Sequence, residues 1–208
     1  MKNWKLRNII VLSSLSVVFA VIYLLFLQVG NVLFGFMGPM GYEIIFGIWF
    51  IVSIIAAYIL RRPGAALLSE TIAGTIEVLI GNTTGPILIL SAFIQGLGAE
   101  AVFAAFRYKS YRKPVLLLAG AGSAVFSFIW GYFYSGMSAL STSLVISMFV
   151  VRIISGVVLA GWLGKWIADA LVKTGVLRNF PIAKQQKLQK LQSHTNSHAT
   201  SHTTIKVE

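Results

Sequence analysis

The stretch Pro63–Gly81, PGAALLSETIAGTIEVLIG, is apolar over the length of a membrane span and yet carries two carboxylates. Glu70 and Glu77 are seven residues apart, or two turns of an α-helix, so both side chains leave the same face. Ala73 and Gly74 lie between them on that face, so the pattern predicts a groove with an acid at each end. Ionisable groups inside a membrane are costly and mark either a ligand site or an internal ion pair. We expect a ligand site here, with a structural pair as the alternative.

The composition places the whole chain in a membrane. Of its 208 residues 57% are hydrophobic and only 11% are charged, which is too little polar surface for a soluble domain. The chain has no cysteine, which excludes disulfides and thiolate chemistry. The formal charge of +11 comes from basic clusters between apolar runs, a pattern typical of membrane orientation rather than of nucleic-acid binding. We therefore expect a multi-pass protein of the cell membrane.

The apolar runs predict an all-α membrane protein with six transmembrane helices. Each run is close to the ~20 residues that a span requires, and the first is too long for a cleavable signal peptide. The expected spans are 9–29, 41–60, 63–80, 85–106, 114–134 and 140–163.

The basic residues predict the orientation of these spans. They occur at the N-terminus, at 61–62, at 107–113 and from Lys165 onward, whereas the intervening loops 30–40, 81–85 and 135–139 have none. Because basic loops stay on the cytoplasmic side, both termini are expected in the cytoplasm.

Two segments outside the spans carry predictions of their own. The apolar, Gly- and Pro-rich segment 30–41 is expected to be an external loop that covers the mouth of the bundle. The composition changes near 178, so we divide the chain into a membrane-embedded substrate-binding domain, 1–178, and a basic, largely disordered cytoplasmic tail, 179–208. Three histidines in the tail are spaced by four residues, but a solvated tail without a metal is the expectation.

Depth estimates suggest which polar residues meet. At about 1.5 Å per residue from the outer end of each span, Glu70, Gln95 and Arg152 all fall near about 15–16 Å. A buried Arg needs a counter-charge, and we expect Glu70 or Glu100 to supply it.

Glu77 and Glu43 then remain as acids near the outer mouth. The aromatic residues Tyr42, Trp49 and Trp130 are expected at a similar level, although Trp130 could instead belong to an interfacial aromatic belt. Carboxylates among aromatic rings suit a cationic or amine-bearing ligand.

Several kinds of chemistry are missing from the sequence. The expected spans contain no histidine, no nucleophile–base pair can be assembled, and there is no Walker A motif. We therefore expect no catalytic residues, no metal and no cofactor, and uphill transport would need a partner or an ion gradient.

Several separate blocks of sequence resemble one known family. They are Gly41-Tyr-Glu-Ile-Ile-Phe-Gly-Ile-Trp-Phe, the stretch around Glu70 and Glu77, Gly85-Pro, the block 94–103 (IQGLGAEAVF), Val151-Arg-Ile-Ile-Ser-Gly and the block 159–165 (LAGWLGK). The chain resembles, over about 1–178, the YkoE-type substrate-binding (S) components of energy-coupling-factor transporters for thiamine or its hydroxymethylpyrimidine precursor.

The resemblance implies a six-helix protein that captures the vitamin outside the cell. It implies as partners a transmembrane coupling subunit and two ATPase subunits. Members of the wider superfamily often dock through an Ala-x-x-x-Ala face on the first span. The nearest match here is Ser16-x-x-x-Ala20, extended by Ser13, since small residues let helices approach closely.

Two other functions stay open at this point. One is a self-contained, proton-coupled exporter of organic cations that uses Glu70 or Glu77, and the other is an intramembrane hydrolase, which the missing nucleophile–base pairs disfavour. The sequence does not separate thiamine from hydroxymethylpyrimidine, because both carry the same aminopyrimidine edge.

Overall fold

The computed structural model describes residues 4–184 and 186–188, and the regular elements within this range are all helical. Three short elements interrupt or connect the α-helices: the 3₁₀ segments η1 (Phe46–Phe50) and η2 (Met137–Ala139), and the π-helical segment η3 (Gly156–Leu163). The α-helices are α1 (Leu6–Met37), α2 (Met40–Ile45), α3 (Ile51–Leu60), α4 (Ala65–Leu79), α5 (Ile87–Ala105), α6 (Lys113–Tyr134), α7 (Thr142–Ser155) and α8 (Gly164–Lys173).

Five continuous helical stretches are long and apolar enough to cross a membrane: 6–37, 40–60, 87–105, 113–134 and 142–173. The remaining predicted span corresponds to α4, which has 15 residues and so extends over about 22 Å. The prediction of helical membrane segments is confirmed for five stretches. The crossing by α4, the count of six and the orientation of the termini stay predictions.

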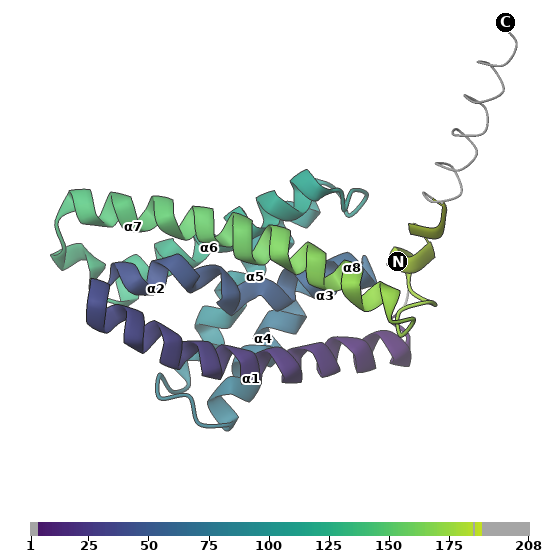
Figure 1. Cartoon of the computed structure of the whole chain (residues 1–208), viewed down its shortest axis with the longest axis horizontal. Helices are drawn as coiled ribbons and strands as arrows, with labels where there is room; N and C mark the ends of the chain where they lie inside the picture. The colour runs from purple at the N-terminus through teal and green to yellow at the C-terminus, as the bar shows by residue number, and fades with distance from the viewer. Residues whose placement is uncertain (1–3, 185, 189–208) are drawn as a thin grey trace, which may run out of the picture.

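The helices alternate in direction between two ends of the bundle. We call the end that contains Gly38, Asn82 and Ser135 the pocket end, and the end that contains Arg61 and Tyr108 the basic end. In Figure 1, α1 and the run from α7 to α8 follow the long axis of the molecule, and α1 begins at the same end at which α8 finishes.

Close backbone contacts hold the bundle together near its basic end. An added Cβ on Gly98 of α5 would lie 2.5 Å from the backbone oxygen of Gly122 on α6, so the two helices touch where both lack side chains. At the same end, the Glu100 carboxylate of α5 accepts hydrogen bonds from the backbone N–H groups of Gly64, Ala66 and Leu67, at 2.6, 3.1 and 3.3 Å. It thereby satisfies the otherwise unpaired donors at the start of α4.

The prediction that 30–41 forms a loop is wrong, while its location outside the cell stays a prediction. α1 continues as helix through Met37, and only Gly38, with φ +60°, and Pro39 separate it from α2. The reason is the apolar composition of 30–37, because backbone groups in an apolar environment are best satisfied within a helix. Phe36 is 84% exposed at the end of this helix.

The residues just after 178 pack against the bundle. Phe180 and Ile182 are buried, and the Arg7 guanidinium lies 4.7 Å from the centre of the Phe180 ring. Gln186 Nε2 donates a hydrogen bond of 2.7 Å to Asp169 Oδ1. The packed structure therefore extends past the predicted boundary at 178. The predictions for 189–208, including the three tail histidines, lie outside the described residues.

Two of the three residues of the predicted docking face on the first span lie inside the bundle. Ser16 and Ala20 are completely buried, and Ser16 Oγ donates a hydrogen bond of 2.8 Å to the Ser69 backbone oxygen on α4. Their small side chains let α1 approach α4, so the close contact is internal. Ser13 is partly exposed.

Candidate functional site

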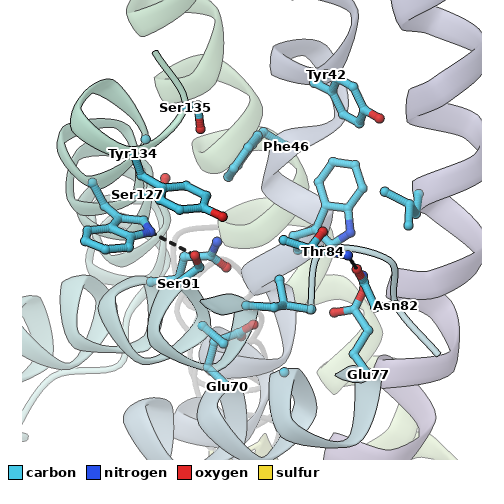
Figure 2. A pocket seen from close by; sticks show the side chains of 18 of the residues that line it. Tyr42, Phe46, Glu70, Glu77, Asn82, Thr84, Ser91, Ser127, Tyr134 and Ser135 are labelled. Carbon is cyan, nitrogen blue, oxygen red and sulfur yellow. Dashed lines mark hydrogen bonds between the residues drawn. The ribbon is translucent and has the colours of Figure 1, made fainter. Parts of the chain in front are cut away.

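A cavity of about 290 Å³ opens at the pocket end of the bundle, near the lower end of the range for small-molecule sites. Figure 2 shows its side chains converging from several helices, with Glu70 and Glu77 along one edge and Tyr134 and Ser135 on another side. The lining residues are Leu27, Tyr42, Phe46, Trp49, Glu70, Gly74, Glu77, Asn82, Thr84, Leu88, Ser91, Ala92, Gln95, Ser127, Trp130, Gly131, Tyr134, Ser135 and Arg152.

Glu77 is fixed by the turn that follows its own helix. Asn82 Nδ2 donates a hydrogen bond of 2.7 Å to Glu77 Oε1 (Figure 2). Asn82 Oδ1 accepts one of 2.7 Å from the Thr84 backbone N–H, which is the local geometry that makes Asn favourable in turns. Asn82 orients one carboxylate oxygen in this way and makes no hydrogen bond to the other.

Glu70 is held from the side of α1. The Tyr23 hydroxyl donates to Glu70 Oε2 at 3.3 Å and accepts from the Val52 backbone N–H at 3.1 Å. The second oxygen, Oε1, is buried, and no described group makes a hydrogen bond of ordinary geometry to it, although the Ser53 backbone N–H interacts with this carboxylate. A buried acceptor without a donor costs free energy, so this oxygen suits a donor brought in by a ligand.

One aromatic wall follows from the 3₁₀ geometry of η1. Phe46 and Trp49 are three residues apart and a 3₁₀-helix has three residues per turn, so both rings lie on one face. Their centres are 5.6 Å apart, and Tyr42 continues the wall at 6.0 Å from Trp49. Trp49 Nε1 donates to the Tyr23 backbone oxygen at 3.2 Å, which fixes the indole plane.

A second aromatic wall comes from α6. Trp130 and Tyr134, one helical turn apart, stack with ring centres 5.5 Å apart and planes at 4°. Trp130 Nε1 donates a hydrogen bond of 2.8 Å to Ser91 Oγ of α5 (Figure 2). The aromatic side chains at the end of α6 point in different directions. Trp130 and Tyr134 line the cavity, whereas Phe133 is 78% exposed on the outside of the bundle.

Arg152 of α7 forms a two-pronged ion pair with Glu43 of α2. Nε and Nη2 each donate to one carboxylate oxygen at 2.5 Å, and the two side chains are 2% and 1% exposed. Arg152 Cζ also lies 3.7 Å from the centre of the Phe46 ring. The prediction that Glu70 or Glu100 neutralises Arg152 is therefore wrong.

The register between two parallel segments explains this partner. The Gly47 backbone N–H donates to Ser155 Oγ at 2.9 Å, and an added Cβ on Gly47 would lie 2.3 Å from the Ser155 backbone oxygen. Both segments run from the pocket end, so Glu43 and Arg152, one turn before this contact, meet at one level. The depth estimates counted residues from the outer end of each predicted span, so they did not include the offset between these two segments.

The structure brings most of the sequence-predicted site residues together. Glu70, Glu77, Tyr42, Trp49, Gln95 and Trp130 all line the cavity, as does Arg152, whose shared level with Glu70 and Gln95 was predicted. Glu43 does not line it, because both its oxygens face Arg152. Gly74 lines it, but the space beside Gly74 is filled by α5, since an added Cβ would lie 2.4 Å from Ala92 Cβ.

The sequence analysis did not include Asn82 and Phe46 among the site residues. An Asn just past the end of the helix that carries Glu77 is within reach of the Glu77 carboxylate. Phe46 could have been found from the aromatic spacing 42, 46 and 49. These cavity positions do not by themselves test binding, so the ligand roles stay proposals.

An apolar helical bundle around an aromatic-walled cavity that contains two buried glutamates is the arrangement expected of a membrane-embedded small-molecule binding protein. The comparisons with known proteins agree with that class. A family model described as "ABC-type cobalt transport system, permease component" matches residues 7–126. The solved structure described as "Crystal structure of an S-component of ECF transporter" superposes with a TM-score of 0.90 at 52% identity, covering 93% of this chain and 98% of that one.

A curated relative gives the same result in sequence. The chain is 53% identical over 200 residues, 96% of its length, to the whole of "Putative HMP/thiamine permease protein YkoE" of Bacillus subtilis (strain 168). The chain belongs to the YkoE family of energy-coupling-factor S components. It is a multi-pass transport protein of the cell membrane. Its relatives are named as permeases and as a transporter component, and none of these names is that of an enzyme.

Proposed function

We propose that this protein captures thiamine or hydroxymethylpyrimidine from outside the cell, as the substrate-binding component of an ATP-driven energy-coupling-factor importer. The observation that carries the proposal is the pair of cavity carboxylates, Glu70 and Glu77, each held by a single side-chain donor, Tyr23 and Asn82. The name of the YkoE relative supports the choice of ligand.

The charges of the cavity favour a ligand with a cationic or amine-bearing edge. Arg152 contributes one formal positive charge, which the bound Glu43 offsets. Glu70 and Glu77 then remain as the acidic side chains of the lining. A carboxylate can accept two hydrogen bonds from an aminopyrimidine edge, and the rings of Trp49 and Trp130 offer faces for an aromatic or cationic ring.

The family model names cobalt, and the cavity suits an organic ligand better. Selective binding of a transition-metal ion needs several converging donor groups. No group of three or more His, Cys, Asp or Glu side chains approaches that arrangement among the described residues. Aromatic walls at the positions of Phe46, Trp49 and Trp130 match a ring-bearing vitamin instead.

The energy for import is proposed to come from partner subunits. The sequence contains no Walker A motif, and the matched solved structure is described as a component of a transporter. We therefore assign this chain one transmembrane coupling subunit and two ATPase subunits as partners.

Calorimetry on the purified, detergent-solubilised protein tests the ligand. Thiamine and hydroxymethylpyrimidine are titrated separately, with choline as a quaternary amine that lacks the pyrimidine edge. We expect saturable binding of at least one of the first two and much weaker binding of choline. Equal binding of all three, or pH-gradient-driven efflux of thiamine by the protein without ATPase partners, would contradict the proposal.

Cysteine labelling tests the proposed orientation. The chain has no native cysteine, so Phe36→Cys places a single thiol at an exposed position of the pocket end. If this end faces outward, as the basic loops at the opposite end indicate, a membrane-impermeant maleimide labels intact cells. Labelling only after the membrane is opened would reverse the orientation.

A further inference from the structure

Arg152 has more donors than its ion pair uses. A guanidinium carries five N–H groups, and Glu43 takes one hydrogen bond from Nε and one from Nη2. The third nitrogen, Nη1, is buried and has no hydrogen-bond partner within the described residues. An unsatisfied donor on a charged, buried group is costly, so an acceptor from elsewhere would stabilise it.

Nη1 lies beside Gly131, which has no side chain, in the wall of the cavity. Gly131 and Arg152 both line the cavity, and an added Cβ on Gly131 would lie 3.4 Å from Nη1 and 3.5 Å from Met137 Cε. The packing of Arg152 Cζ against the Phe46 and Phe128 rings, at 3.7 and 5.0 Å, holds the guanidinium in this position. The donor is therefore fixed before a ligand arrives.

We propose that Arg152 Nη1 donates a hydrogen bond to the hydroxyl oxygen of the bound vitamin and thereby selects hydroxylated ligands. This inference rests on the proposed function, because it places the amine-bearing edge of thiamine on the carboxylates of α4 and its hydroxyethyl arm at α7. Arg152 is thus a specificity-determining residue in addition to half of an ion pair.

The charge balance identifies the acceptor as an uncharged hydroxyl rather than a phosphate. Glu43 already offsets the formal charge of Arg152, and Glu70 and Glu77 share the cavity. A phosphate ester would bring up to two further negative charges into a site with surplus acid, where like charges repel strongly because little water screens them.

The test is a series of calorimetric titrations with thiamine, deoxythiamine, in which hydrogen replaces the hydroxyl group, and thiamine monophosphate. On the parent protein, removal of the hydroxyl should weaken binding by about tenfold or more, the usual consequence of losing a hydrogen bond to a charged donor. Thiamine monophosphate should also bind more weakly than thiamine. Equal affinities for thiamine and deoxythiamine would overturn the inference, and tighter binding of the monophosphate would assign Nη1 to a phosphate.

The variant Gly131→Ala tests the position of the donor. Its methyl group fits at ordinary contact distance, 3.4 Å from Nη1. If the ligand hydroxyl approaches Nη1 past Gly131, the methyl group obstructs it, and the discrimination between thiamine and deoxythiamine should fall to within about twofold. Gly35→Ala is the matched control, since an added Cβ there has open space around it and the parent discrimination should persist. Thermal unfolding checks that both variants fold. Full discrimination in a folded Gly131→Ala variant would exclude Nη1 as the donor.

Different results would contradict the proposed function and the proposed role of Arg152. If the parent binds neither thiamine nor hydroxymethylpyrimidine, the proposed function fails. If the parent binds thiamine and ignores the hydroxyl, only the role of Arg152 fails.

Discussion

Glu100 at the basic end and Glu77 at the pocket end are both buried glutamates, 8% and 2% exposed, but their surroundings differ. Glu100 accepts three hydrogen bonds from backbone N–H groups of the loop and first turn of α4. Glu77 accepts one from Asn82 and lines a cavity. Burial alone therefore does not separate a structural carboxylate from one that lines a cavity, whereas the number of hydrogen bonds from protein donors does.

The packing of α5 against α6 shows the same contrast. Their backbones touch at Gly98 and Gly122 toward the basic end. The cavity-lining residues of α5 end at Gln95, about one turn before that contact. Toward the pocket end the two helices are bridged by side chains instead, with Trp130 bound to Ser91. Between α5 and α6, glycines therefore allow backbone contact on one side of this level, and larger side chains separate the helices on the other.

The largest effect is expected for the satisfied charge pair at the pocket end. Glu43→Gln removes the counter-charge of Arg152 inside the bundle, and breaking a buried pair costs about 3–5 kcal/mol of stability. Denaturant unfolding in detergent measures it. The double variant Glu43→Gln/Arg152→Met removes both charges and should recover much of the loss. A single variant as stable as the parent would show that the pair does not hold α2 to α7.

The next effect concerns binding rather than folding. Glu77→Gln keeps the size of the side chain and removes its charge, so thiamine affinity should fall by about 10- to 100-fold, as expected for a lost charge-assisted hydrogen bond. Calorimetry gives the affinity, and thermal unfolding should change little, because Asn82 can still pair with the Gln amide. Unchanged affinity would remove Glu77 from the site.

Glu100→Gln is expected to show the opposite pattern. Loss of the carboxylate at the start of α4 should reduce stability by about 1–2 kcal/mol, the upper range for charge at a helix N-terminus, while thiamine affinity stays at the parent value. Unfolding and titration of the same preparation measure both. An affinity loss as large as that of Glu77→Gln would erase the distinction between the two ends.

The smallest effect is expected at the contact between α1 and α4. Ser16→Ala removes the hydrogen bond to the Ser69 backbone oxygen but keeps the helices close, so stability should fall by about 0.5–1.5 kcal/mol. Co-purification with the coupling subunit should persist, because Ser16 is buried inside the bundle. If the variant is stable but no longer co-purifies with the coupling subunit, Ser16 takes part in docking after all.

Much of the secondary structure could be read from local pattern. Long apolar runs specify membrane helices, because each backbone group must then be satisfied within its own segment. The period of the α-helix is sufficient to place Glu70 and Glu77 on one face, and both line the cavity. The end of α1 was predicted wrongly because the Gly and Pro content of 30–41 indicated a loop, although 30–37 is apolar enough to stay helical.

The amino-acid sequence by itself determined the membrane class, the helical runs and the shared face of Glu70 and Glu77, since each follows from a period or a composition within one segment. Only the tertiary structure decided that Glu43 pairs with Arg152, that Ser16 and Ala20 point inward, and that Arg152 lines the cavity. These features depend on the rotation and register of helices far apart in the chain. That register is fixed by contacts such as Gly47 with Ser155, which no periodicity within a single helix encodes.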